Sequence, residues 1–320
     1  MNKIKKQLRK IISSDSIGLL VALAVLIVLF SSINENYFTL RNLRNVFTSG
    51  SLSGLICVGE SMLLIGGLMD LSPGSTAAIS GVVAALLLSM GMPVGLVLII
   101  VLLIGVAVGA FNAFFVTQLK ISSFIVTLAS QSIVRGFCYI ISNGESILIS
   151  DKFFLSLGTQ NILGIAFPIF FMVLMFVVFY IVLTRTRFGR NVYTVGGNPI
   201  AARLAGISTK ATTYALFIIM SVLAALGGTI LAARMNTGQP QACTGLEFDG
   251  ITAAILGGVA MSGGYGSLIG AFVGLLILQG FNNGLTLVNV PSFWQYVAKG
   301  GLLLLALSFD YFRSKNRKSI

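Results

Sequence analysis

The chain has 320 residues, of which 56% are hydrophobic and only 9% are charged, and its mean hydropathy is +0.97. A soluble domain carries about 25% charged residues, so a water-soluble protein is excluded and an all-α integral membrane protein is predicted. The formal net charge of +12 comes mostly from basic residues at the two ends and in one central loop, so we expect no nucleic-acid partner.

About ten transmembrane helices are expected between a basic N-terminal segment, residues 1–16, and a basic tail, residues 311–320. No small-residue cleavage site follows the first apolar run, so we expect this run to be a span and not a signal peptide. The transmembrane domain is therefore predicted to be residues 17–310. The expected spans are residues 17–33, 47–68, 76–90, 94–118, 124–141, 164–184, 212–233, 251–261, 267–287 and 293–309.

Two stretches do not fit regular membrane helices. The sequence GGLMDLSPGS, residues 66–75, combines glycines, an acid and a proline, so we expect a break in the helix there. The eighth span, residues 251–261, is short for a hydrocarbon core about 30 Å thick, so it either begins earlier or is partly re-entrant. Residues 34–45 and 234–250 are polar and are expected to be loops outside the membrane.

Glycine spacing indicates close packing between spans. Gly105 and Gly109 are four residues apart, as are Gly270 and Gly274, and such pairs let two helix backbones approach each other. The similar sequences GAFN and GFNN occur once in each half of the chain. Because the spacing around them differs, an internal repeat that would give pseudo-symmetric halves is left open.

The distribution of basic residues predicts the orientation. With the N-terminus in the cytoplasm, the internal segments hold 15 Lys and Arg residues and the external loops hold four. This asymmetry follows the positive-inside rule and places both termini in the cytoplasm. It also places the central basic loop, residues 185–210, on the cytoplasmic side.

Residues 185–210, RTRFGRNVYTVGGNPIAARLAGISTK, hold five basic residues and no acid. Asn198 is a good N-cap and Pro199 fits the first helical position, while Gly206 suits a left-handed stop. Ile200 and Leu204 share one face of this short helix. A helix of about seven residues is marginal in water, so it needs a partner surface. The pattern alone allows either a docking site for a water-soluble protein or a helix that rests on lipid.

Several separated motifs resemble the ribose-type permease family of bacterial ABC sugar importers, and the resemblance runs from about residue 42 to residue 305. They are GGLMDLSPGS, FIVTLASQSIVRG, TRFGRNVYTVGGNPIAARLAGI, ITAAILGGVAMSGGYGSLIGA and GFNNGLTLV. The resemblance implies a ten-span permease subunit in the bacterial cytoplasmic (inner) membrane. It also implies a second permease subunit, identical or related, a cytoplasmic ABC ATPase and a periplasmic sugar-binding protein.

The chain has no GxxxxGK[ST] phosphate-binding loop, so we expect ATP on the partner subunit and no cofactor in this chain. Under the resemblance, the central loop couples the permease to the ATPase. The expected coupling residues are Gly196, Gly197, Asn198, Ala201, Arg203, Leu204 and Gly206.

Charged side chains within spans are costly in lipid, so Glu60, Asp70 and Arg135 are expected to face protein or water. Arg135 lies about 21 Å along its span and Glu60 lies at a comparable depth, so we expect these two side chains to pair. Uncharged polar side chains near them could line a path for a hydroxyl-rich solute, or simply bond neighbouring helices. The candidate path residues are Glu60, Asp70, Asn112, Gln131, Arg135, Asn282 and Asn283.

Two other classes of function compete with an ATP-driven permease. A secondary transporter could use Glu60, Asp70 and Arg135 for ion coupling, and a protonophore would then abolish its uptake. An intramembrane enzyme is disfavoured because the chain has no histidine and no recognisable nucleophile–base pair. We expect no catalytic residue and no metal site. The three cysteines are widely separated and are expected to be packing residues.

Overall fold

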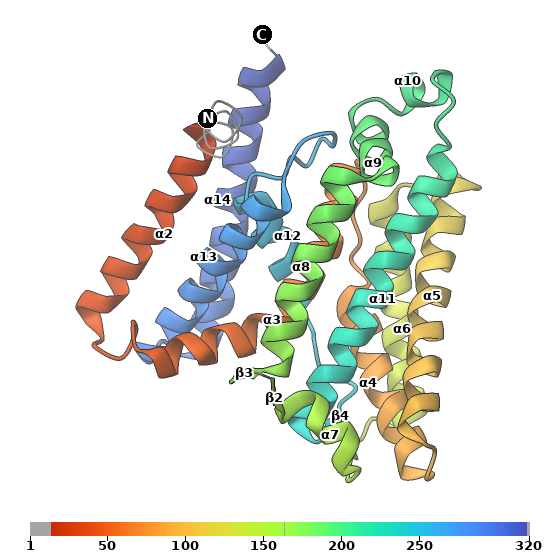
Figure 1. Cartoon of the computed structure of the whole chain (residues 1–320), viewed down its shortest axis with the longest axis vertical. Helices are drawn as coiled ribbons and strands as arrows, with labels where there is room; N and C mark the ends of the chain where they lie inside the picture. The colour runs from red at the N-terminus through yellow and green to blue at the C-terminus, as the bar shows by residue number, and fades with distance from the viewer. Residues whose placement is uncertain (1–13, 163, 319–320) are drawn as a thin grey trace.

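A computed structural model describes residues 14–162 and 164–318 (Figure 1). The predicted basic segments at the two ends lie partly outside these residues. The helices are α2 (Ser14–Ile33), α3 (Leu40–Ile65), α4 (Pro73–Ser89), α5 (Val94–Thr117), α6 (Ser123–Ser142), α7 (Lys152–Thr159), α8 (Phe167–Arg185), α9 (Arg187–Gly197), α10 (Pro199–Leu204), α11 (Thr209–Met235), α12 (Leu246–Leu256), α13 (Leu268–Leu287) and α14 (Ser292–Lys318). The short strands are β1 (Ile147–Leu148), β2 (Asn161–Ile162), β3 (Ile165–Ala166) and β4 (Thr237–Gly238).

The integral-membrane character predicted from composition agrees with this architecture. Within the described ranges, six helices are long and apolar enough to cross a membrane, namely α3, α5, α6, α8, α11 and α13. The apolar part of α2 and helix α4 are shorter. The number of ten spans therefore stays a prediction. Helices α9 and α10 lie at one end of the molecule and α7 lies at the other, and these ends are called the α10 end and the α7 end (Figure 1).

Two helices begin at least five residues before their predicted spans. Helix α3 begins at Leu40, so residues 40–45 are helical and not part of the predicted loop. The reason is local, because Thr39 Oγ1 accepts a hydrogen bond from Asn42 N and caps the helix. Helix α12 begins five residues before the predicted eighth span, directly after Gly245, whose φ is 81°. Of the two alternatives for this span, the earlier start agrees with the structure, although α12 ends at Leu256 and, at 11 residues, is no longer than the predicted stretch.

Helix α3 forms the centre of the core, since every residue from Gly50 to Ile65 is buried. Helix α11 packs against α3, α4 and α5. A methyl group at Gly109 of α5 would lie 2.6 Å from Ile218 Cα of α11. A methyl group at Gly274 of α13 would overlap the Ala253 carbonyl oxygen of α12. The close helix approach predicted from the glycine pairs is confirmed.

Two short helices begin inside the bundle and run in opposite directions (Figure 1). After α3 reaches the α10 end, residues 66–72 return without helical structure, and α4 runs toward the α7 end. After α11 reaches the α7 end, residues 236–245 return, and α12 runs toward the α10 end. The predicted break is present at 66–72, while residues 73–75 already belong to α4. Residues 234–250 are not simply a loop outside the bundle.

Candidate functional site

The predicted short helix in the central loop is present as α10. Asn198 Oδ1 accepts hydrogen bonds from Ile200 N and Ala201 N, both at 3.0 Å, and Gly206 has a φ of 79°. Ile200 is 70% exposed and Leu204 is 86% exposed. Two neighbouring apolar side chains on a polar end of the molecule make a small contact surface without a partner inside the described chain.

Helix α9, directly before α10, was not predicted from the sequence. Thr186 Oγ1 accepts from Gly189 N at 3.1 Å and caps it, and Val192 and Val195 are buried on one face. Tyr193 Oη donates to the Gly266 carbonyl oxygen at 2.8 Å. Burial raises the pKa of the Tyr193 phenol, so it stays a hydrogen-bond donor.

Three backbone segments meet near α10: the end of α3, the end of α9 and the 257–267 loop. They meet at four glycines, Gly67, Gly196, Gly263 and Gly264, and we call this contact the glycine knot. Gly264 N donates to the Ile65 carbonyl oxygen at 2.8 Å. A methyl group at Gly196 would overlap that same oxygen. Gly263 has a φ of 82°, and a methyl group there would lie 2.9 Å from Gly67 Cα. The ends of α3 and α9 therefore touch the 257–267 loop directly, which only glycine permits.

A second candidate site lies where α4 and α12 begin. A methyl group at Gly74, in the first turn of α4, would lie 2.5 Å from the Cys243 carbonyl oxygen and would overlap Glu247 Oε2. The N-terminal ends of the two helices therefore face each other. Both ends carry partial positive charge, and the nearby carboxyls of Asp70 and Glu247 offset it. We call this place the helix crossing.

Hydrogen bonds link several predicted path residues at the helix crossing. Glu60 Oε1 accepts from Asp70 N at 3.1 Å, and Asp70 Oδ1 accepts from Ser72 N and Ser72 Oγ at 2.7 and 2.6 Å. Asn112 Nδ2 donates to Ser72 Oγ at 3.0 Å. Gln131 Nε2 donates to Glu247 Oε1 at 2.8 Å. The sequence analysis missed Glu247, although it lies only four residues before the apolar run of the predicted eighth span.

Four acceptor oxygens at the helix crossing are buried without a hydrogen-bond partner among the described residues. They are Glu60 Oε2, Asp70 Oδ2, Asn112 Oδ1 and Glu247 Oε2. An unsatisfied buried polar atom costs about 1–3 kcal/mol, so each of these oxygens favours a donor from elsewhere. A hydroxyl-rich molecule could supply such donors.

The predicted pair between Glu60 and Arg135 is wrong. Arg135 Nη1 donates to the carbonyl oxygens of Pro240 and Ala242 instead. Within the described ranges the ion pair joins Lys299 Nζ to Asp249 Oδ2 at 3.2 Å. Depth along a span does not fix the direction in which a side chain points. The sequence also does not show that the non-helical segment 236–245 supplies the acceptors for Arg135.

Asn282 and Asn283 do not join the helix crossing. Asn283 pairs with Asn42 through two side-chain hydrogen bonds of 2.7 and 3.0 Å, and this fits the interhelical alternative. Asn34 Nδ2 donates to the Leu287 carbonyl oxygen nearby. These contacts fasten the α2–α3 turn and the start of α3 to α13.

Replacing Glu60 by alanine is expected to destabilise the protein, whereas glutamine should be tolerated. Alanine leaves Asp70 N–H buried without an acceptor, at a cost of about 1–3 kcal/mol, while the glutamine amide oxygen can still accept. Thermal unfolding in detergent should show a lower midpoint for Glu60→Ala and a nearly unchanged one for Glu60→Gln. Equal losses in both variants would contradict this hydrogen-bonding role.

Residues 42–307 match the family model described as branched-chain amino acid transport system / permease component. The L-arabinose ABC transporter permease protein AraH of Azospirillum brasilense is 39% identical over 95% of this chain and 89% of its own length. The ribose import permease protein RbsC of Haemophilus influenzae is 35% identical over 91% of each chain.

The D-allose transport system permease protein AlsC of Escherichia coli is 34% identical over 94% of this chain and 93% of its own length. No solved structure matches the chain. The similarity to sugar permeases indicated by the sequence motifs is confirmed, and it extends along almost the whole chain.

Proposed function

The chain belongs to this family of transport-system permease components, and we propose that it is the membrane subunit of an ABC importer for a monosaccharide. The observation that carries the proposal is the full-length similarity to permeases named for arabinose, ribose and allose. This similarity favours an ATP-driven permease over the ion-coupled alternative. A separate ABC ATPase binds and hydrolyses ATP, and a binding protein outside the membrane delivers the sugar.

The α10 end faces the cytoplasm in this proposal, and the membrane is the bacterial inner membrane. The excess of Lys and Arg in residues 185–210 and at the two chain ends supports this orientation. The start of α2 and the end of α14 lie toward the same end as α10 (Figure 1). Ten spans, a permease domain at residues 17–310 and a second permease subunit, identical or related, complete the arrangement.

Helix α10 is the contact to the ATPase. The exposed Ile200 and Leu204 side chains insert into an apolar groove of the partner, while Asn198 and Gly206 fix the ends of the helix. The helix-in-groove mode needs only such a short amphipathic element. The coupling set is the one predicted from the sequence, Gly196, Gly197, Asn198, Ala201, Arg203, Leu204 and Gly206, in which Gly197 only continues the helix, because a methyl group there would lie at an ordinary 3.9 Å from Gly264 Cα. Within it, Gly196 connects the contact to the rest of the permease through the glycine knot.

The helix crossing is the narrowest part of the sugar path. Its unpartnered acceptor oxygens can take hydrogen bonds from sugar hydroxyls one after another, and weak contacts of this kind let a solute leave again. Glu60, Asp70, Asn112 and Gln131 are path residues in this proposal, and Glu247 joins them. Asn283 is a packing residue instead, because its side chain bonds Asn42, and Asn282 lies apart from the crossing with its Oδ1 buried and unpartnered among the described residues.

The double variant Ile200→Asp, Leu204→Asp tests the contact with the ATPase. A buried Leu or Ile side chain contributes about 1.5–3 kcal/mol, so losing two should weaken binding by about 100-fold or more. Co-purification of the ATPase with the permease should be lost. The control is Leu148→Asp, because Leu148 is equally exposed, at 74%, but lies toward the α7 end.

Uptake by the assembled complex tests the rest of the proposal. Proteoliposomes with the ATPase and binding protein should accumulate L-arabinose, D-ribose or D-allose only with ATP, and a protonophore should have no effect. Retained ATPase binding in the double variant would remove α10 from the coupling role. Uptake that needs an ion gradient and no ATP would refute the importer itself.

A further inference from the structure

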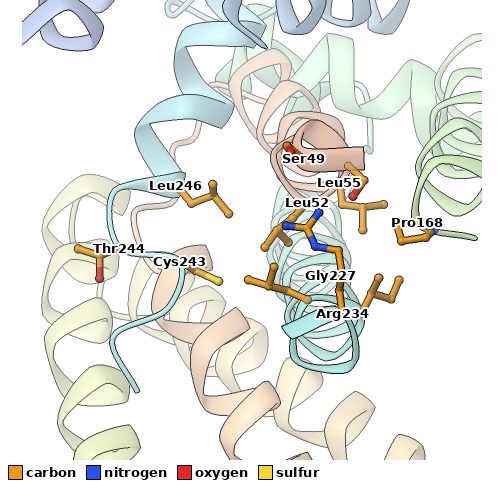
Figure 2. A pocket seen from close by; sticks show the side chains of 12 residues that line it. Ser49, Leu52, Leu55, Pro168, Gly227, Arg234, Cys243, Thr244 and Leu246 are labelled. Atoms are coloured by element: carbon orange, nitrogen blue, oxygen red, sulfur yellow. The ribbon is translucent and has the colours of Figure 1, made fainter. Parts of the chain in front are cut away.

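Two neighbouring cavities lie between the helix crossing and the α7 end. The first has a volume of about 250 Å³ and lies between α3, α11, the start of α8 and the start of α12 (Figure 2). The second, of about 260 Å³, lies between α4, α11 and residues 237–243. Leu231, Arg234 and Cys243 line both cavities. Figure 2 shows Cys243 on one side of the first cavity and Arg234 on the other.

The lining of both cavities suits a small neutral solute with many hydroxyl groups. Ser49, Ser51 and Thr244 bring hydroxyls to the first cavity, and Thr237 and Gln239 bring polar groups to the second. The remaining lining is largely apolar, as in most sites for small molecules. Asp and Glu side chains do not line either cavity, so a cation has no charged ligand there.

Arg234, which lines both cavities, supplies hydrogen-bond donors to them. Its Nη1 donates to the Thr48 carbonyl oxygen at 2.8 Å, and no carboxylate within the described ranges forms an ion pair with it. A guanidinium group carries five N–H donors, so several remain for the ring and hydroxyl oxygens of a sugar.

Cys243, which lines both cavities, ends a constrained segment, residues 240–243, that Arg135 holds in place. Arg135 Nη1 donates to the carbonyl oxygens of Pro240 and Ala242, immediately before Cys243. Cys243 has a φ of 63°, a left-handed conformation that side chains other than glycine rarely adopt. A strained segment of this kind persists only where its surroundings fix it, and the Arg135 side chain is the polar anchor.

We propose that the two cavities are the halves of one monosaccharide-binding chamber, and that residues 240–243, anchored by Arg135, are its movable wall. The inference rests on the proposed importer function and adds a binding place and a gate to it. Each cavity alone is smaller than the roughly 300 Å³ at which small-molecule sites begin, and joining them brings the chamber into that range. Arg135 is a positioning residue, because it acts through the wall.

Cys243 gives a direct test in the unmodified complex. Proteoliposomes that transport one of the sugars L-arabinose, D-ribose and D-allose are treated with N-ethylmaleimide. Mass spectrometry then measures how fast each cysteine is labelled. The transported sugar should slow Cys243 labelling by about tenfold at ten times its dissociation constant. A sugar that the complex does not transport is the control. Cys57 and Cys138, both fully buried, should stay unlabelled.

Two variants test the wall and the volume. Arg135→Met should speed sugar-free labelling of Cys243 by about tenfold, since it removes two charge-assisted hydrogen bonds, whereas the surface control Arg44→Met should not. Leu231 lines both cavities, so Leu231→Trp should fill part of the chamber and stop uptake while ATPase co-purification persists. Val28→Trp, at an exposed position on α2, is its size-matched control.

Failure of this inference is distinguishable from failure of the importer function. A complex that transports sugar with ATP, but whose Cys243 labels at the same rate with and without that sugar, overturns the chamber and leaves the importer intact. Unchanged labelling in Arg135→Met overturns the movable wall. Normal uptake by a folded Leu231→Trp protein also overturns the chamber.

Discussion

Replacing Gly196 by alanine is expected to lower ATP-driven sugar uptake by about 100-fold, because displacement of a packed backbone by about 1 Å is enough for an effect of that size. The added methyl group overlaps the Ile65 carbonyl oxygen, which accepts the hydrogen bond from Gly264 N. Alanine is otherwise the better helix former by about 1 kcal/mol, so local propensity predicts the opposite result. Uptake by proteoliposomes and ATPase co-purification would both be measured.

The matched control is Gly197→Ala. Gly197 is the next residue of the same helix, and a methyl group there would lie 3.9 Å from Gly264 Cα, an ordinary van der Waals contact. Gly197→Ala should transport normally, and Gly196→Ala should still bind the ATPase through α10. Normal transport by Gly196→Ala as well as by Gly197→Ala would show that the glycine knot does not transmit the movement of α10.

The expected effect of Gly196 follows from where the glycine knot lies. Helix α10 continues from α9, and α9 ends against both the end of α3 and the 257–267 loop. The end of α3 is connected to α4 by residues 66–72, and the 257–267 loop directly follows α12. A rigid shift of α10 therefore reaches both helices of the crossing through backbone contacts, and packed backbones transmit such shifts without much deformation.

The sequence predicted α10 because its signals are local. Asn198, Pro199 and Gly206 each act within a few residues, and each has the predicted role in the structure. Helix α9 has the same kind of signal in Thr186, but the glycines within α9 normally weaken a helix and so argue against it. Those glycines serve contacts with distant backbones, which no local pattern contains.

The sequence identifies the polar residues of the spans one by one, but it does not show which of them lie together. Glu60, Asp70 and Asn112 stand out because polar groups are costly in lipid. Their assembly with Glu247 depends on the second non-helical segment folding back beside the first. Depth along the spans favours Glu60 as the partner of Arg135, but the actual acceptors are backbone carbonyls, which the sequence does not distinguish.

Replacing Gly74 by valine is expected to abolish a stable permease, because it forces apart the two helix ends that meet at the crossing. Backbone and side chain both obstruct the new group, since the β-carbon would lie 2.5 Å from the Cys243 carbonyl oxygen and would overlap Glu247 Oε2. Overpacking of this kind costs about 1–3 kcal/mol, and breaking the surrounding hydrogen bonds adds to it. Thermal unfolding in detergent and sugar uptake should both show large losses.

The fold offers a closely matched control at Gly95. Both glycines occupy the second position of a helix, Gly74 after Pro73 in α4 and Gly95 after Val94 in α5, so the change in helix propensity is the same. A β-carbon at Gly95 has no neighbour within 4 Å. Gly95→Val should therefore stay close to wild type in both measurements. Similar behaviour of the two variants would mean that α4 and α12 do not meet tightly, and the path proposed between them would lose its narrowest point.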